Sequence, residues 1–169
     1  VFLHYILGIF SFFFGDETPA KGHTHEFYIN QSRVFLITRM SIRFHRTPKC
    51  NETLIFTTWF RTTEGKFFLR DCDVRSPDGE LIASASGTWA LIDPIEHKVL
   101  DVKAHPDERL GFSAFKADSP ACKKIIPEEA LPVIGHRQVY YTDLDCNNHI
   151  NNAAYSRIAT DFLPPEYQS

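Results

Sequence analysis

Four runs of residues between positions 34 and 93 constrain the fold more than any other feature of this sequence. In the first run, Met40, Ile42 and Phe44 alternate with polar residues, which is typical of a strand with one buried face. The second run, at 54–62, is β-branched and aromatic. The third and fourth runs, at 66–75 and 80–93, flank the turn sequence "SPDG". The pattern predicts an antiparallel sheet of four long strands.

The fourth run contains five consecutive small residues, which would allow another element to approach it closely: Ala83, Ser84, Ala85, Ser86 and Gly87. An antiparallel sheet also needs a cover for one face, and a single long helix can supply it. The apolar run at 1–14, "VFLHYILGIFSFFF", predicts that helix. It is too short to span a bilayer as a helix. The core of a signal peptide is the alternative interpretation, although no basic region precedes the run and no clear cleavage site follows it.

The composition excludes some classes of protein. The formal net charge is −3, so the balance does not point to nucleic acid as a partner. Fifteen phenylalanines fit either an aromatic core or a pocket for a lipid-sized ligand. The four cysteines (Cys50, Cys72, Cys122 and Cys146) form no CxxC pair, so we expect reduced thiols in a cytosol-like compartment.

The last third of the chain predicts the beginning of a second unit. Residues 96–132 hold several prolines and mixed charges, which is typical of an irregular linker. Residues 135–142 have strand character, and residues 151–163 have helical character, ending before Pro164 and Pro165. Strand, polar loop and helix therefore follow one another.

The polar loop, within "YTDLDCNNHINNAAY" at 141–155, leaves several interpretations open. Asp145, Asn147 or Asn148 could cap the helix that follows. Asp145 and His149 could bind a metal, although no further histidine lies at ligand spacing. Cys146 and His149 are poorly spaced as nucleophile and base. Asp145, Asn147 and His149, at alternate positions, could instead activate water and stabilise an oxyanion.

The stretch "DLDCNNHINNAAY" resembles the D-x-N-x-H-x-N-N-x-x-Y signature of acyl-acyl carrier protein (acyl-ACP) thioesterases. The resemblance extends back through "FLITRMSIRFHRTPKCNETLIFTTW" and "FFLRDCDVRSPDGELIASASGTWALID", and it covers residues 34–163. It implies an α+β class and a hotdog fold, in a double-hotdog architecture whose second unit is incomplete. The expected divisions are a first hotdog domain at 1–118, a linker at 119–132 and the start of a second hotdog domain at 133–169.

The resemblance also implies the site and the reaction. Asp145, Asn147 and His149 occupy the catalytic positions of the family, and no cofactor or metal is expected. The family uses a further acidic or thiol residue on a later strand, to which no residue before Ser169 corresponds. The implied function is hydrolysis of fatty acyl-ACP to free fatty acid by a C-terminally truncated member, which we expect to be inactive and either poorly soluble or oligomeric when expressed alone.

The implied partner is acyl carrier protein bearing a fatty acyl chain, without nucleic acid or a membrane span. Arg39, Arg43 and Arg46 are candidates for docking this acidic carrier, and a solvated strand face is the alternative interpretation. An acyl-CoA thioesterase and a non-catalytic acyl-binding or assembly module remain the rival functions. A homodimer is considered as the assembly, and the expected location is cytoplasmic, or the plastid for a plant protein.

Overall fold

The structure is a computed structural model that describes residues 25–105, 111–127, 131–145 and 148–167. The helix predicted at 1–14 lies outside the described residues. The chain divides near residue 125 into two compact units, each of which is described by itself below.

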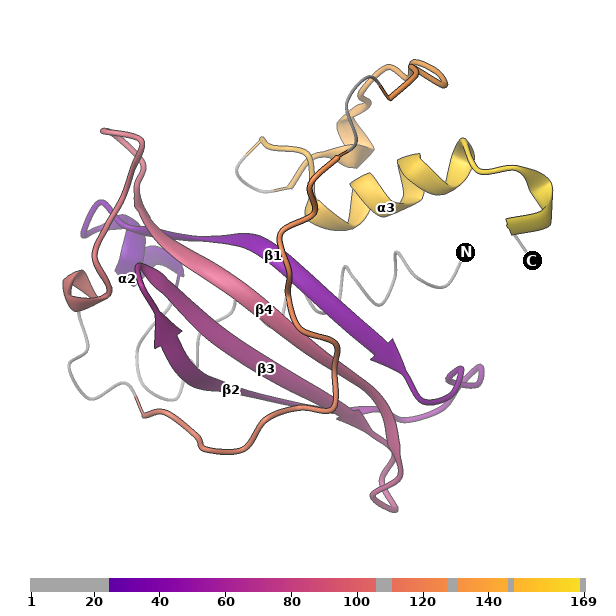
Figure 1. The fold of residues 1–169 in the computed structure, drawn as a ribbon, viewed down its shortest axis with the longest axis horizontal. Coiled ribbons are helices and arrows are strands. Elements are labelled where there is room, and N and C mark those ends of the chain that lie inside the picture. The colour runs from indigo at the N-terminus through magenta and orange to yellow at the C-terminus, as the bar shows by residue number, and fades with distance from the viewer. Residues whose placement is uncertain (1–24, 106–110, 128–130, 146–147, 168–169) are drawn as a thin grey trace. The chain divides into compact units, whose positions relative to one another are not determined.

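The first unit is built on an antiparallel sheet (Figure 1). A short helix, α2 (His25–Ile29), leads into it. Its strands are β1 (Val34–Phe44), β2 (Ile55–Glu64), β3 (Phe67–Arg75), β4 (Leu81–Asp93) and the short β5 (Lys98–Val99). The order across the sheet is β1-β4-β3-β2, and β5 pairs with the end of β4. A single 3-10 turn, η2 (Val102–Ala104), follows β5.

The four predicted strands are confirmed, and their ends agree with the predicted ends to within two residues. The prediction succeeds because period two in the sequence matches the alternation of side chains along a strand. The hairpin turn at 76–79 is also present, with Gly79 at φ 93°, a backbone conformation that glycine adopts without steric cost.

One face of the sheet carries its aromatic core. The register sets Phe68 opposite Trp89, and Trp89 opposite Ile37 on β1. The rings of Phe35 and Phe68 lie 5.2 Å apart in an edge-to-face arrangement, and Phe60 lies 6.1 Å from Phe68. Phe68 is almost fully buried, and burial of a side chain of this size stabilises the fold by about 1.5–3 kcal/mol.

The other face of the sheet is polar and yet buried. Asp71 lies opposite Ser86 in the register, and Asp73 lies opposite Ser84. The Ser86 hydroxyl donates to Asp71 at 2.8 Å, and the Ser84 hydroxyl donates to Asp73 at 3.0 Å. Buried carboxylates need such partners, because an unpaired charge in the interior is costly.

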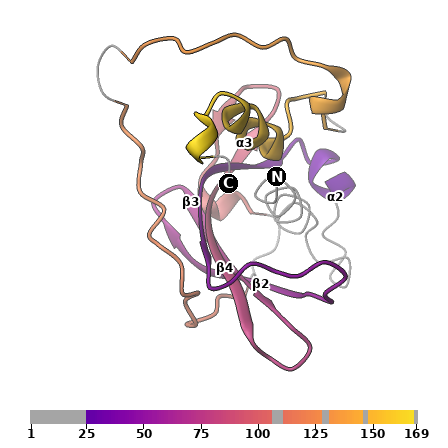
Figure 2. The same ribbon diagram turned by 90° about the vertical axis from the view of Figure 1, so that its right-hand side faces the viewer.

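An irregular stretch, the crossing segment (residues 111–125), covers this polar face, as Figure 2 shows along one side of the sheet. The Ala117 amide donates to the Asp71 carboxylate at 3.0 Å, and the Ser119 hydroxyl lies 2.6 Å from that of Ser86. The Cys122 thiol donates to the Ser86 carbonyl at 2.9 Å. The close approach predicted from the small residues of β4 is therefore confirmed, and the approaching element is this segment.

The second unit contains one regular helix among its described residues. A 3-10 turn, η3 (Tyr141–Asp143), precedes the polar loop, α3 (Asn152–Asp161) follows it, and η4 (Pro165–Tyr167) comes after Pro164. The helix predicted at 151–163 is confirmed, including its end before the prolines.

The strand predicted at 135–142 is wrong. Residues 131–140 have neither helix nor strand structure, and the 3-10 turn begins at Tyr141. A strand exists only where a neighbouring strand accepts and donates its backbone hydrogen bonds. Among the described residues of this unit, the β-pairing is limited to one isolated bridge, between Leu144 and Ile150.

Candidate functional site

The polar loop between η3 and α3 is a small hairpin. Leu144 and Ile150 pair as an antiparallel bridge, and the Asp145 amide donates to the His149 carbonyl at 2.8 Å. The Asp145 carboxylate accepts from the His149 amide at 3.1 Å. Asn148 has φ 59°, a left-handed conformation that asparagine tolerates better than most residues. The backbone thus closes the loop by bringing Asp145 and His149 opposite each other.

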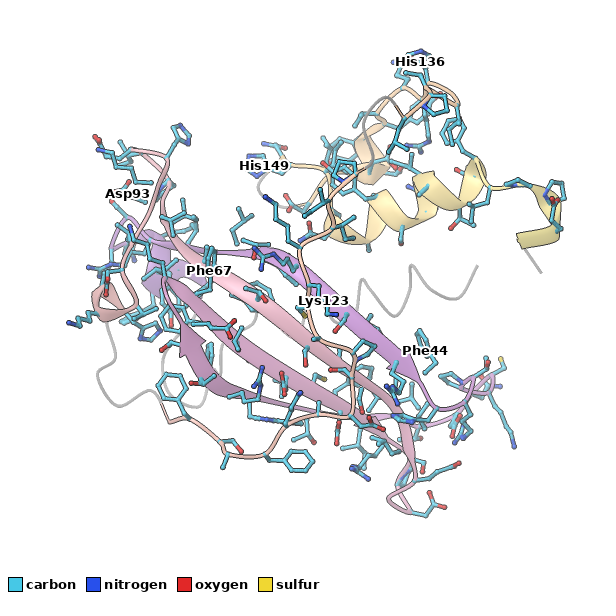
Figure 3. All side chains as sticks on the ribbon, in the orientation of Figure 1. Phe44, Phe67, Asp93, Lys123, His136 and His149 are labelled. Carbon is cyan, nitrogen blue, oxygen red and sulfur yellow. The ribbon has the colours of Figure 1, made fainter. Side chains whose placement is uncertain are left out.

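Two of the three predicted catalytic residues are placed by the structure. Asp145 is partly buried. His149, which Figure 3 labels, is exposed on the loop that precedes α3. An exposed imidazole beside a carboxylate-bearing residue can exchange protons with a substrate or with water. Asn147 and Cys146 lie outside the described residues, so the alternation of three catalytic side chains stays a prediction.

The helix cap is a different residue from those considered in the sequence. Asn151 caps α3, and its side-chain oxygen accepts from the Ala153 amide at 2.9 Å. Asp145 and Asn148 are therefore not the N-cap, because the N-cap is the residue directly before the helix and α3 begins at Asn152. The start of α3 directly after the loop places free amide groups and a positive dipole end next to it.

Sequence reasoning missed Asp143, the residue at the base of the loop. Its carboxylate is fully buried and accepts from Arg137 at 2.7 and 3.1 Å, from the Tyr140 amide at 2.8 Å, and from Arg157. The Arg137 guanidinium, the Tyr140 amide and Arg157 hold the pKa of Asp143 well below its usual range. The Asp143 carbonyl also accepts from the Asn151 amide at 2.8 Å.

A signal for Asp143 exists in the sequence, although it is weak. Arg137 lies six residues before Asp143, and Arg157 lies fourteen residues after it in a predicted helix. Neither spacing predicts contact by itself, since the loop must fold back before Arg157 can reach the carboxylate.

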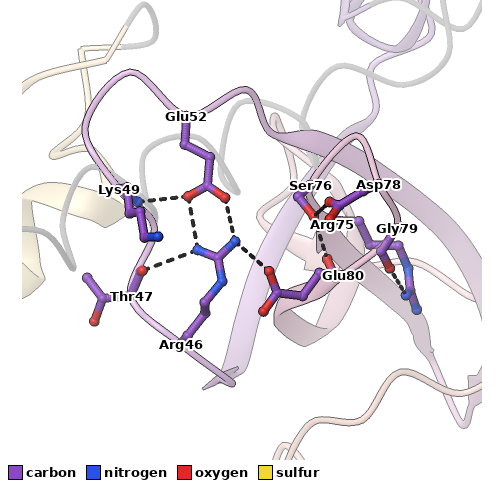
Figure 4. A network of polar contacts seen from close by, with 9 residues as sticks. All are labelled: Arg46, Thr47, Lys49, Glu52, Arg75, Ser76, Asp78, Gly79 and Glu80. Carbon is purple, nitrogen blue, oxygen red and sulfur yellow. Dashed lines mark hydrogen bonds and ion pairs between the residues drawn. The ribbon is translucent and has the colours of Figure 1, made fainter.

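The three arginines considered for carrier docking do not form an unpaired basic surface. Arg46 donates to Glu52 and Glu80, joining the turn after β1 to the turn before β4 (Figure 4). Arg43 lies 3.3 Å from Asp118, and Arg39 lies over the ring of Phe67, 5.9 Å from its centre. The ion pairs of Arg43 and Arg46 favour the alternative interpretation, a solvated strand face with local charge pairing.

Across the described ranges, no three or more histidine, cysteine, aspartate or glutamate side chains are grouped so that they could hold a metal ion. None of the helices in the described part of the chain is long and apolar enough to cross a membrane.

Solved structures define the fold class. The chain superposes on a candidate oleoyl thioesterase of Lactobacillus plantarum with a TM-score of 0.77, at 22% identity, over 96% of this chain and 63% of that one. It superposes on a 12:0-ACP thioesterase of Umbellularia californica with a TM-score of 0.63, at 21% identity, over 86% and 58% of the two chains. The predicted α+β class and hotdog fold are confirmed.

Family comparison then assigns the chain. The sequence model of the acyl-ACP thioesterase N-terminal domain matches residues 16–108, and that of the C-terminal domain matches residues 132–168. The protein belongs to the acyl-ACP thioesterase family, as the resemblance implied. The N-terminal match extends that resemblance back from residue 34 to residue 16.

Curated relatives are distant in sequence and much longer than this chain. A chloroplastic acyl-[acyl-carrier-protein] hydrolase of Cuphea viscosissima is 25% identical over 169 residues, which cover 90% of this chain and 38% of that protein. The chloroplastic oleoyl-acyl carrier protein thioesterase 2 of Arabidopsis thaliana is 25% identical over 149 residues, covering 79% and 39%. The chain therefore spans less than half the length of these relatives.

Proposed function

We propose that the protein hydrolyses the thioester that joins a fatty acyl chain to acyl carrier protein, and so releases a free fatty acid. The observation that carries the proposal is the loop at 144–150, which lies in the C-terminal family domain and brings Asp145 and His149 together before α3. The curated relatives are named as thioesterases or hydrolases of acyl carrier protein substrates.

The chemistry requires no redox partner. Water attacks the thioester carbonyl, a carbon–oxygen bond forms, and the carbon–sulfur bond breaks as the carrier thiol leaves with a proton. We assign to His149 the role of general base, which removes a proton from the attacking water. Asp145 and Asn147 would hold this water or the polar groups around it. Free amide groups at the start of α3 can stabilise negative charge on the carbonyl oxygen.

The acyl chain itself needs an apolar surface. Phe35 and Phe60 are partly exposed on the aromatic face of the sheet, and they support placing the acyl chain on the first unit. The proposed domains remain 1–118 and 133–169, joined by a linker at 119–132. A homodimer and a location in the plastid or cytoplasm belong to the same proposal.

The central experiment measures hydrolysis of acyl-ACP by the full-length gene product. We expect His149→Ala and Asn147→Ala each to lower kcat/KM at least about a hundredfold, the scale expected for a lost general base or oxyanion group. His136→Ala is the matched control, because His136 is an exposed histidine of the same unit outside the loop (Figure 3). Near-normal turnover by a folded His149→Ala or Asn147→Ala variant would refute the site.

The same assay separates the rival functions. Acyl-CoA and acyl-ACP of equal chain length are compared under identical conditions. A clear preference for acyl-CoA would favour the acyl-CoA thioesterase. Acyl binding without hydrolysis of either substrate would favour the non-catalytic module.

Cys146 tests the alternative nucleophile. If activated water is the nucleophile, Cys146→Ser keeps most of the activity, because serine is similar in size to cysteine. A serine hydroxyl cannot take over the work of a thiolate nucleophile, so a catalytic cysteine would not tolerate the change. Loss of activity in Cys146→Ser, together with a trapped acyl-cysteine in the unmodified protein by mass spectrometry, would show covalent catalysis instead.

A further inference from the structure

One carboxylate connects the three segments that surround the candidate catalytic loop. Arg137 approaches Asp143 from the irregular segment before the loop, and Arg157 approaches it from the middle of α3. The Tyr140 amide completes the set from the turn that begins the loop. The Asp143 side chain is therefore the point at which the preceding segment, the loop base and the helix meet.

The backbone of Asp143 continues this connection into the loop. Its carbonyl accepts from the Asn151 amide, and Asn151 is also the cap of α3. The next pairing inward is the Leu144–Ile150 bridge, and then the Asp145 amide bonds the His149 carbonyl. Asp143 is thus the outermost rung of a short hairpin whose inner rung joins Asp145 to His149.

The burial of this carboxylate separates its role from that of a catalytic group. Asp143 is 0% exposed, so its oxygens are occupied by the arginines and the Tyr140 amide and do not reach a substrate. Arg137 is further held by the ring of Tyr140, whose centre lies 5.4 Å from the guanidinium carbon. Removal of one member of a buried ion cluster leaves an uncompensated charge. The positions of Arg137 and Arg157 therefore depend on the Asp143 carboxylate.

We propose that Asp143 is a positioning residue, which fixes the loop carrying Asp145 and His149 relative to the start of α3 through Arg137 and Arg157. The proposal rests on the proposed function for its effect on catalysis, and on the contacts of Asp143 for its effect on the loop. Displacement of a catalytic group by about 1 Å can lower a rate by about a hundredfold, so the connection matters for turnover.

The test combines kinetics with amide hydrogen exchange in the full-length protein. We expect Asp143→Asn to lower kcat for acyl-ACP about 10- to 100-fold with KM within about twofold, because the substrate-contacting groups remain but are misplaced. We also expect the His149 and Asn151 amides to exchange at least about tenfold faster, since the base of the hairpin is loosened. Arg137→Lys, which keeps the positive charge, serves as a milder variant if Asp143→Asn does not fold, and it is expected to show the same changes at smaller size.

Glu166→Gln is the matched control, because it removes one negative charge from an exposed residue of the same unit. It should leave kcat and loop exchange unchanged. Unchanged kcat and exchange in folded Asp143→Asn would overturn the positioning role, and so would a change in KM alone. Faster loop exchange in Asp143→Asn, with no thioester hydrolysis by the unmodified protein, would refute the proposed function while supporting the connection between Asp143 and the loop.

Discussion

Individual cysteines of this chain differ mainly in their surroundings. Cys72 lies on β3, which pairs with β2 and β4, and it is fully buried; this burial, as the largest effect, raises the pKa of its thiol to about 12. Cys50 lies exposed in the turn after β1. Since the thiolate is the reactive form, the two residues should differ in chemistry although they are chemically identical in the sequence.

We therefore predict that iodoacetamide at pH 8 modifies Cys50 in the folded protein and leaves Cys72 unmodified until the sheet unfolds. Peptide mass spectrometry with and without denaturant measures both positions. The raised pKa also implies that the neutral Cys72 thiol stabilises the fold fully below about pH 8.5 and that this contribution decreases as the pH rises toward 12. Equal labelling of Cys50 and Cys72 under native conditions would contradict the prediction.

The pKa of Glu52 is shifted downward, whereas that of Cys72 is shifted upward. Hydrogen bonds from the Arg46 side chain and the Lys49 amide lower the pKa of Glu52 to about 2. Its ionised form is favoured in the folded state, so its contribution to stability is present above its ordinary pKa of about 4.3 and is lost as the pH falls toward 2.

We predict that Glu52→Gln lowers the Tm at pH 6 and makes the Tm less dependent on pH between about 5 and 2. Thermal unfolding followed by circular dichroism at several pH values measures both effects. Glu96→Gln is the control, because the Glu96 carboxylate is exposed and forms a surface ion pair with Lys98. An identical acid dependence in Glu52→Gln and the unmodified protein would show that the Arg46 network contributes nothing.

At the scale of elements, the crossing segment shows how an irregular stretch becomes part of a core. Residues 111–125 form no helix or strand, yet Ala117 and Ser119 are buried against the polar face of β3 and β4. Asp71 holds the segment through the Ala117 amide, and its other oxygen accepts from Ser86. Arg61 lies 3.2 Å from the same carboxylate and supplies the opposite charge.

We predict that Asp71→Ala lowers the free energy of unfolding by about 3–5 kcal/mol, because it leaves Arg61 without its carboxylate and Ala117 without its acceptor. Urea unfolding measures the stability, and hydrogen exchange at Ala117 measures detachment of the crossing segment. Asp118→Ala is the matched control, since Asp118 pairs with Arg43 on the surface of the same segment, and it should cost at most about 1 kcal/mol. Equal effects of the two variants would show that the buried contacts do not anchor the segment.

At the scale of the whole molecule, the two units differ in how far their backbone N–H and C=O groups are hydrogen-bonded within regular structure. The central strands β3 and β4 are hydrogen-bonded on both sides and buried along almost their whole length. Residues 131–140 form no regular structure, and Leu131, Val133 and Ile134 are exposed apolar side chains. Local stability should follow this difference, because exposed backbone opens more easily.

We predict that amides of residues 131–139 exchange at least about a hundredfold faster than amides of β3 and β4. The Tyr140 amide is left out because it donates to the buried Asp143 carboxylate. Native-state hydrogen exchange with fragment analysis measures both in one sample. Comparable protection in the two regions would mean that residues 131–139 are paired in solution, in the strand that the sequence suggested.

The sequence by itself determined the parts that depend on local patterns. Period two along β1, the turn "SPDG" and the prolines after α3 specify strand, hairpin and helix end without reference to distant residues. The family signature likewise identified the loop and the candidate residues Asp145, Asn147 and His149.

Only the tertiary structure decided which distant groups meet. The pairing of Asp71 with Ala117, and of Asp143 with Arg157, joins residues 46 and 14 positions apart in different segments, which no local pattern brings together. The segment at 135–142 has strand composition and remains irregular, because a strand needs a partner and composition does not supply one. Local periodicity can be read along one chain segment, whereas burial of a charge beside its partner depends on how separate segments pack together.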